Sequence, residues 1–169
     1  MDLRPATSTD IPAVMVLVRR VVPLMRATGN LQWDDHYPNP SVFERDINLR
    51  QLWIAKADGL IAGIAAITED QEPEYATVGW DIEERAIVVH RLAVDPDFQG
   101  KGVAGVLMLQ AEKVATERGI SVLRVDTNTN NAVTQKLFPK LGYTLSGEIL
   151  LNYRPGLRFL GYEKRLTGG

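Results

Sequence analysis

The sequence contains no cysteine and only two histidines, His36 and His90, which lie far apart along the chain. Without thiols, the chain cannot form a disulfide, a thiolate metal site or a covalent cysteine intermediate. Two separated histidines also exclude a multi-histidine metal centre, and we expect no metal. The chemistry must therefore use hydroxyls, carboxylates, imidazole, backbone groups or a bound cofactor.

The chain also lacks long basic runs and long apolar runs. Its formal net charge is −2, and because binding to a nucleic-acid backbone needs clustered Lys and Arg, we expect no nucleic-acid partner. No apolar stretch approaches the roughly 20 residues that cross a membrane. The start, MDLRPATSTD, does not have the pattern of a secretory signal. We therefore expect a cytoplasmic protein without membrane association.

The remaining composition, 45% hydrophobic and 24% charged residues, is typical of one globular domain over residues 1–169. Hydrophobic periodicity predicts an α/β fold, α+β by some schemes, in which helices cover both faces of a mixed sheet. The predicted order is β-α-α-β-β-β-α-β-α-β-β: strand 3–7, helices 10–29 and 39–49, strands 51–57, 60–68 and 86–94, helix 102–118, strand 120–127, helix 131–141, and strands 143–151 and 156–166.

Local signals add detail to this order. Ser8 or Thr9 is expected to cap the first helix, and Pro23 is expected to kink or break it. Asp58-Gly59 predicts a hairpin turn. The segment 86–94, AIVVHRLAV, is nearly continuously apolar, which is typical of a strand buried on both faces.

Three glycines follow that strand in the stretch 97–105, DFQGKGVAG. Taken alone, Gly100-x-Gly102-x-x-Gly105 satisfies the dinucleotide-binding fingerprint, with Asp126 where the ribose-binding acid belongs. A dinucleotide fold turns directly from strand into glycine, whereas here residues 95–99 intervene and too few βα units follow. This interpretation is kept as an alternative.

A longer pattern resembles the GNAT superfamily of acyl-CoA-dependent N-acetyltransferases. Residues 90–108, HRLAVDPDFQGKGVAGVLM, match the family's strand, loop and helix. Residues 124–149, RVDTNTNNAVTQKLFPKLGYTLSGEI, resemble its next strand, its Asn-started helix and the Gly-aromatic that enters the following strand. The resemblance implies a mixed, mostly antiparallel central sheet flanked by helices.

The resemblance also implies that acetyl-CoA is a co-substrate. Amides at a helix N-terminus suit its pyrophosphate, with Lys101 as an outer charge. The pantetheine arm would pair like an added strand with residues 92–94, where two strands splay apart, and an amide near Val94 would polarise the thioester carbonyl. Asn131 matches the family's asparagine and is also a plausible helix cap. The residues expected to bind the coenzyme are Leu92, Ala93, Val94, Gln99, Gly100, Lys101, Gly102, Val103, Ala104, Gly105, Asn131 and Phe138.

Acetylation of an amine needs a base and can use an acid. In many relatives a tyrosine on the last helix is that acid, but residues 137–143 align Phe138 with it, and phenylalanine cannot donate a proton. Either another residue supplies the proton, the thiolate leaves unassisted, or the protein binds acyl-CoA without transferring the group. The candidate catalytic residues are His90, Asp126 and Tyr143, with Tyr153, Glu83 and Glu84 as further candidates.

Each of these candidates also has a purely structural interpretation. Alternation puts His90 on the strand face that carries Val88 and Leu92, where it is either a base or a hydrogen-bonded core histidine. Asp126 is either a partner of that histidine or a turn carboxylate, and Tyr143 either donates a proton or packs in a strand.

The loop between the first two helices commonly forms a substrate wall in this family. Trp33, Asp34 and Tyr37 would suit a cationic amine there, since aromatic faces and carboxylates both attract cations, although Trp33 would equally plug the edge of the core. The resemblance thus implies an N-acetyltransferase that moves an acetyl or other short acyl group to a primary amine of a small molecule, protein or peptide. A non-catalytic acyl-CoA sensor is the alternative, and a dinucleotide-binding oxidoreductase is the third. The apolar final strands are compatible with a homodimer.

Overall fold

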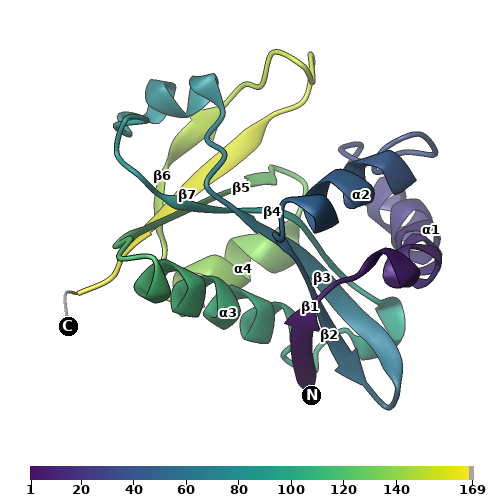
Figure 1. Cartoon of the computed structure of the whole chain (residues 1–169). Helices are drawn as coiled ribbons and strands as arrows, with labels where there is room; N and C mark the ends of the chain where they lie inside the picture. Colours follow the sequence, from purple (N-terminus) through teal and green to yellow (C-terminus); the bar gives the residue numbers. More distant parts are fainter. Residues whose placement is uncertain (168–169) are drawn as a thin grey trace.

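The computed structural model describes residues 1–167 and forms one sheet in the order β1-β2-β3-β4-β5-β7-β6 (Figure 1). All neighbouring strands are antiparallel except β4 and β5, which are parallel. The predicted mixed, mostly antiparallel sheet is therefore confirmed. The elements are β1 (Asp2–Pro5), α1 (Ile11–Ala27), α2 (Pro40–Asn48), β2 (Leu52–Ala57), β3 (Leu60–Thr68), β4 (Ile87–Val94), α3 (Val103–Glu117), β5 (Val122–Asn128), α4 (Ala132–Lys140), β6 (Thr144–Ile149) and β7 (Phe159–Arg165), with short 3-10 helices η1 (Ser8–Asp10), η2 (Pro73–Val78) and η3 (Pro96–Phe98).

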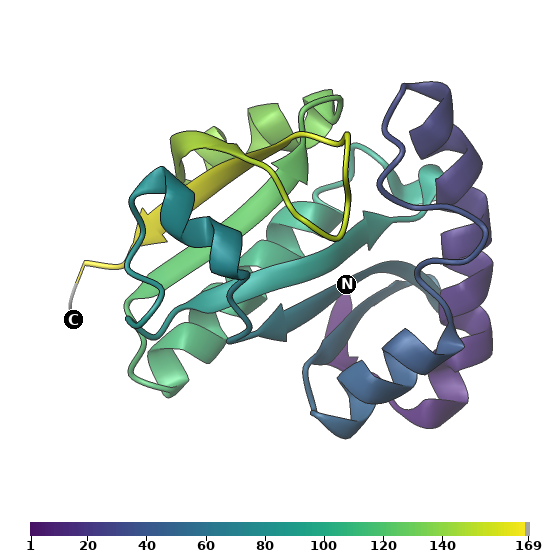
Figure 2. The ribbon, with the colours of Figure 1, turned by 90° about the horizontal axis from the view of Figure 1, so that it is seen from above.

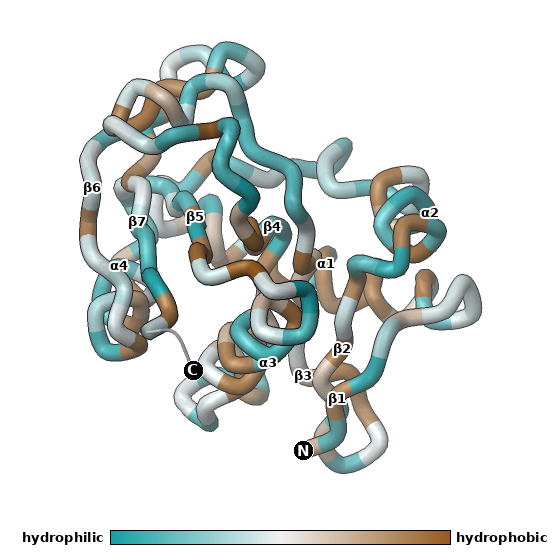
Figure 3. Tube along the Cα trace, turned by 60° about the vertical axis from the view of Figure 1, so that its left-hand side comes forward, coloured by the Kyte–Doolittle hydropathy of each residue, from teal (hydrophilic) through white to brown (hydrophobic). Residues whose placement is uncertain are grey.

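Helices cover both faces of the sheet, and each face has its own core. On one face α3 and Phe138 of α4 pack on strand residues such as Ile87 and Leu123. On the other face α1 and α2 pack over β2 and β3, and η2 packs over β6 and β7 (Figure 2). The buried residues of α3 recur every three or four positions, as expected of a helix with one buried face, and its first half is largely hydrophobic (Figure 3).

The expected cap of the first helix is wrong, and of the kink or break expected at Pro23 the break does not occur. Neither Ser8 nor Thr9 caps the helix; instead Thr7 and Asp10 form a capping box around η1, in which the Thr7 amide donates to the Asp10 carboxylate at 2.8 Å. The helix also continues through Pro23 to Ala27, so no break occurs there. The buried face of α1 packs against the sheet, and this packing outweighs the one hydrogen bond that proline removes.

Strands β4 and β5 are paired over only a short length. Their partners are Ile87 with Leu123, Val88 with Arg124, and Val89 with Val125. Beyond Val89, β4 stays paired with β3, while β5 stays paired with β7 as far as Asn128. The two strands therefore part after Val89, and the edge of β4 that faces β5 is left without a strand partner.

A β-bulge marks the same point. The β3–β4 register shifts between Ile64 and Ala66, opposite Arg91, whose φ of 51° lies in the left-handed region. The bulge interrupts the two-residue alternation, so the expectation that Leu92 shares a face with Val88 is wrong. Val88 packs with Tyr75 beneath η2, whereas Leu92 packs against the core under α3.

Arg91 is anchored by a buried carboxylate on α2. Its Nε and Nη2 donate to Asp46 at 2.6 and 2.7 Å, and Gln51 donates to the same carboxylate at 2.9 Å. The Asp46 side chain is only 1% exposed. This bidentate pair fastens α2 to the bulge of β4.

Within residues 1–167, none of the helices combines the length and the apolar character that crossing a membrane requires.

We expect Asp46→Asn to lower the free energy of unfolding by about 3 to 5 kcal/mol at neutral pH, because the Arg91 guanidinium loses its buried counter-charge. Urea unfolding followed by circular dichroism measures this difference. Glu44→Gln, on the exposed side of the same helix, is the matched control and should change stability by less than about 0.5 kcal/mol. Similar small effects of both substitutions would contradict the anchoring role of Asp46.

Candidate active site

Two cavities meet where β4 and β5 part. A groove of about 440 Å³ runs along the end of β4, the loop before α3, and the sides of α1 and α4. A second cavity of about 260 Å³ lies between the loop after α1, the segment before η2 and the β6–β7 loop. Both are lined by Met25, Asn30, Leu92, Asn131 and Thr134, so a ligand in the groove can touch a ligand in the cavity.

The groove is built around the glycine stretch. Gly100 and Gly102 have φ values of 74° and 81°, and a Cβ on either would meet open space rather than protein. Gly102 is also the residue before α3, whose first amide bonded within the helix is that of Val106. The amides of the first turn are therefore free to bind an anion such as a phosphate group.

The coenzyme-binding residues predicted from the sequence mostly line this groove. Lys101 and Phe138 are the exceptions. Lys101 does not line the groove; its Nζ lies 5.5 Å from the centroid of the Phe98 ring. Phe138 is buried in the wall of the second cavity. The predicted residues that do line the groove are Leu92, Ala93, Val94, Gln99, Gly100, Gly102, Val103, Ala104, Gly105 and Asn131.

Asn131 has two roles in the geometry. Its side chain accepts the Thr134 amide at 3.2 Å, which caps α4. The same residue lies at the junction of groove and cavity.

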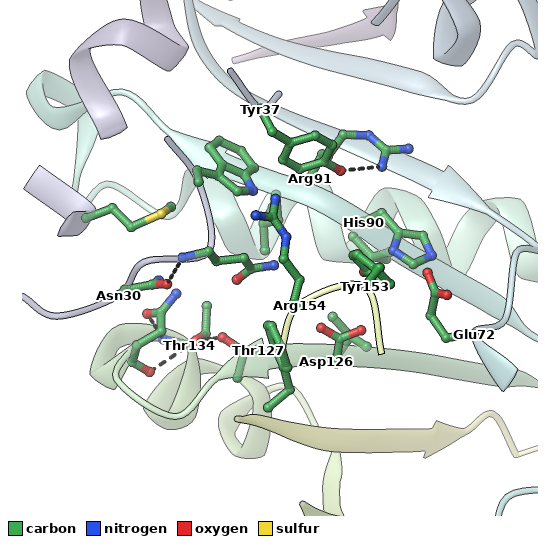
Figure 4. Close-up of a pocket in the computed structure, with 18 of the residues that line it drawn as sticks. Asn30, Tyr37, Glu72, His90, Arg91, Asp126, Thr127, Thr134, Tyr153 and Arg154 are labelled. Carbon is green, nitrogen blue, oxygen red and sulfur yellow. Dashed lines mark hydrogen bonds between the residues drawn. The ribbon is translucent and has the colours of Figure 1, made fainter. Parts of the chain in front are cut away.

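His90 and Asp126 are the first residues after the last pair of β4 and β5, Val89 and Val125. Both line the second cavity, and Glu72 joins them from the segment before η2 (Figure 4). The Nε2 atom of His90 lies 3.0 Å from the carbonyl oxygen of Asp70. The structure thus brings together the predicted pair of His90 and Asp126 and adds a second carboxylate to it.

The surroundings of these carboxyl groups disfavour their ionised forms. Burial raises the pKa of Asp126, while the His90 charge and a hydrogen bond from Tyr75 act in the opposite direction. Burial also raises the pKa of Glu72, and Asp126 adds to the increase. A cation bound between the two groups would offset both effects, so this end of the cavity suits an ammonium ion.

Tyr75 orients the Asp126 carboxylate. Its hydroxyl donates to Asp126 Oδ2, and its buried ring packs edge-on against Trp80 with 5.1 Å between the ring centroids. Trp80 is itself held by a 2.8 Å hydrogen bond from its indole nitrogen to Ser146.

Aromatic and cationic groups form the other side of the cavity. The guanidinium carbon of Arg154 lies 4.8 Å from the centroid of the Tyr37 ring, and the Tyr37 hydroxyl accepts a 3.3 Å hydrogen bond from Arg91 (Figure 4). Tyr153 also lines this cavity. Trp33 lines it as well, but it is only 3% exposed and packs with α1, which fits the core-edge interpretation; its contact with a substrate stays a prediction.

Tyr143 is not brought to the site. It packs in the core beneath α3 and α4, where its hydroxyl has no hydrogen-bond partner and burial raises its pKa. Tyr143 directly precedes β6, which within the described residues pairs with β7 and forms the far edge of the sheet. The sequence placed this residue on a plausible strand but could not say on which side of the sheet it lies.

Three further acidic candidates lie outside the cavity. Asp34 is used by its own loop, since its Oδ1 accepts the amides of His36 and Tyr37 at 2.7 and 2.9 Å. Glu84 forms ion pairs with basic side chains at the opposite end of β5, and its exposed neighbour Glu83 is likewise absent from the cavity wall. Asp34 and Glu84, which the sequence suggested as site residues, are thus engaged in local hydrogen bonds and ion pairs instead.

Glu72, Arg154 and Tyr75 were not identified from the sequence. Each comes from a segment without regular periodicity, either the polar stretch 69–85 or the turn around Pro155. No motif marks them, and only the packing of these segments over the end of β5 brings them to the cavity. In residues 1–167, no three side chains of metal-binding type are grouped so as to hold a metal ion.

Comparisons with known proteins agree with this geometry. The sequence model of the acetyltransferase (GNAT) family matches residues 20–143. A GNAT-family acetyltransferase structure from Streptococcus agalactiae superposes with a TM-score of 0.83 at 28% identity, covering 99% of this chain and 96% of that one. The structure of yncA from Salmonella typhimurium, solved with acetyl-CoA, has a TM-score of 0.72 at 18% identity, covering 100% and 95%.

Among curated proteins, the streptothricin acetyltransferase of Escherichia coli is 36% identical over 66 residues. That match includes 39% of this chain and spans only 38% of the relative's length.

We expect Tyr75→Phe to raise the pKa of Asp126 further, because the lost hydrogen bond favoured the ionised carboxylate. Carboxyl ¹³C NMR titration of Asp126 in the free protein measures the change. Tyr162→Phe, a buried tyrosine outside the cavity, serves as the control and should leave the titration where it is. An unchanged or lowered pKa in Tyr75→Phe would show that Tyr75 does not orient the carboxylate.

Proposed function

Because the chain belongs to the acetyltransferase (GNAT) family, we propose that it transfers an acetyl or other short acyl group from acetyl-CoA to a primary amine by direct attack. The observation that carries this proposal is the junction of the two cavities. The groove suits an elongated anionic coenzyme, and the carboxylates beyond the junction suit an ammonium ion. The two reactants would therefore meet near Leu92.

Acetyl-CoA fits the groove in two respects. The free amides at the start of α3 would bind its diphosphate, while the open edge of β4 would pair with the amide groups of the pantetheine arm. The presence of acetyl-CoA in the related yncA structure supports the same choice.

In the proposed reaction, the amine nitrogen forms a bond to the thioester carbonyl carbon and the carbon–sulfur bond breaks. The nitrogen loses a proton to a base, and the sulfur leaves with the bonding electron pair as a thiolate, which takes up a proton. Acceptor and acyl group are thereby joined as an amide, and free coenzyme A is the other product. No covalent enzyme intermediate is involved.

Asp126 and His90 both line the cavity, and in the proposed reaction they hold the ammonium group and take its proton. Tyr153 is the proton donor that the cavity offers in place of the tyrosine replaced by Phe138. Burial and the carboxylates of Glu72 and Asp126 raise the pKa of Tyr153, which keeps its phenol protonated at neutral pH.

Phe138 supports one alternative, a protein that binds acyl-CoA without transferring the acyl group. Its ring forms part of the cavity wall and packs against Tyr143 and Tyr162. Because phenylalanine has no hydroxyl, this position cannot donate a proton to the leaving thiolate. The dinucleotide-binding alternative is wrong, because in residues 1–167 the pair of β4 and β5 is the sole parallel one and a dinucleotide fold needs a parallel sheet.

We expect Gly102→Ala to weaken acetyl-CoA binding about tenfold in calorimetric titration, because a side chain strains the left-handed backbone and narrows the anion site. Gly79→Ala is a matched control: Gly79 has a φ of 83°, a Cβ there would also meet open space, and it lies outside the groove. Gly79→Ala should strain the backbone to the same extent as Gly102→Ala but should leave the affinity for acetyl-CoA unchanged. Binding of NAD in place of acetyl-CoA, or equal losses in both variants, would contradict the assignment of the groove.

We expect Asp126→Asn to lower kcat/KM for the acceptor at least about 100-fold while acetyl-CoA affinity stays within about twofold. The wild-type kcat/KM should rise with pH through a pKa above the usual aspartate range, because Asp126 must be ionised and burial raises its pKa. Asp58→Asn, in the hairpin turn of β2 and β3, is the control with the same chemical change.

Coenzyme A release, followed with a thiol reagent, measures these rates across a panel of primary amines. Binding of acetyl-CoA with no release for any amine would favour the non-catalytic alternative. Full activity of Asp126→Asn would remove this residue from the mechanism.

A further inference from the structure

The second cavity has opposite charges on its two sides. Glu72 and Asp126 lie with His90 where β4 and β5 part, and the Arg154 side chain enters from the β6–β7 loop (Figure 4). Tyr153 lies between these groups: the two carboxylates raise the pKa of its hydroxyl and Arg154 lowers it. A ligand in this cavity therefore meets a negative end and a positive end.

The positive end is not neutralised by the protein. Arg91 is paired bidentately with the buried Asp46, and Arg158 on the β6–β7 loop pairs with Glu148. Arg154 forms no ion pair with any described carboxylate and instead rests on the Tyr37 ring. Asp34 is near enough for Arg154 to contribute to its lowered pKa, but its carboxylate accepts backbone amides of its own loop.

The size of the cavity limits what can span the two ends. Its volume of about 260 Å³ is below the range of roughly 300 to 1,000 Å³ typical of sites for drug-sized ligands. A polycationic amine would place a second positive charge against Arg154, which is unfavourable. A small molecule with one ammonium group and one anionic group matches both charge and volume.

We infer that the acceptor is a compact zwitterion of the amino-acid type, whose amine lies between Glu72 and Asp126 and whose carboxylate is held by Arg154. This inference rests on the proposed acetyltransferase function and adds the class of acceptor to it. The guanidinium fork matches a carboxylate in two parallel hydrogen bonds. Arg154 is thus a specificity-determining residue, whereas His90 and Asp126 act on the amine itself.

The test compares matched acceptors that differ only in the anionic group. Coenzyme A release is measured with acetyl-CoA and each common L-amino acid, the diamino acids 2,4-diaminobutyrate and ornithine, β-alanine and γ-aminobutyrate, each alongside its carboxamide. Spermidine, putrescine and the cationic antibiotic streptothricin form a second set without a carboxylate. We expect turnover of at least one carboxylate acceptor and a kcat/KM at least about 30-fold lower for its carboxamide.

Arg154→Gln should reduce this discrimination to less than about threefold, mainly by raising KM for the carboxylate. Arg158→Gln is the matched control, because this arginine lies on the same loop, is exposed and does not line the cavity. It should keep the wild-type discrimination. A variant that merely disturbs the loop would lower kcat/KM for acid and carboxamide alike, and that result would overturn the role of Arg154.

The outcomes separate this inference from the proposed function. Turnover confined to the second set, or equal turnover of acids and carboxamides, overturns the zwitterionic acceptor and leaves acetyl transfer standing. No turnover of any amine, despite binding of acetyl-CoA, overturns the acetyltransferase function and the inference that rests on it.

Discussion

The parting of β4 and β5 after Val89 and Val125 is the constraint on which the site depends. A parallel pair that continued further would close the edge of β4, and neither a groove nor a cavity would reach the middle of the sheet. The left-handed Arg91 turns β4 away, and its ion pair with Asp46 holds that conformation against the tendency of the strands to pair. The bulge thus lies beside His90, at the point where the edge of β4 becomes open.

The cavity illustrates how a binding site is maintained at a cost to stability. Burying Asp126 beside Glu72 disfavours ionisation of both, and the free protein supplies only His90 and the Tyr75 hydroxyl as partial compensation. Elsewhere in the described chain, comparable charges are compensated: Arg124 is fully buried yet bonded to Glu163 and other acceptors. Ionisable groups with shifted pKa values and without a full counter-charge are typical of ligand-binding and catalytic sites.

How much of the molecule could be predicted from the sequence depends on whether the signal is local. The order of elements and the glycine stretch before α3 were predicted, because periodicity and positive-φ glycines act over a few residues. That His90 and Asp126 line one cavity was also expected, since each directly follows the last paired residue of two adjacent strands. Tyr143 and Asp34 were misassigned because the face of a strand and the hydrogen bonds within a loop depend on packing. Arg154 carries no local signal at all, and its position results from the folding of a distant loop over Tyr37.

The groove and the second cavity are built from different kinds of chain segment. The groove is formed largely by β4, the loop to α3 and the start of α4, all fixed to the sheet. The far wall of the cavity comes from the loop after α1, the polar stretch before η2 and the turn between β6 and β7. If the cavity binds the acceptor as proposed, substitutions in those connections would change which amine is accepted without disturbing the core, whereas the residues of the groove are held by the sheet. Under that proposal, a change of acceptor specificity would need changes only in loops at the periphery of the fold.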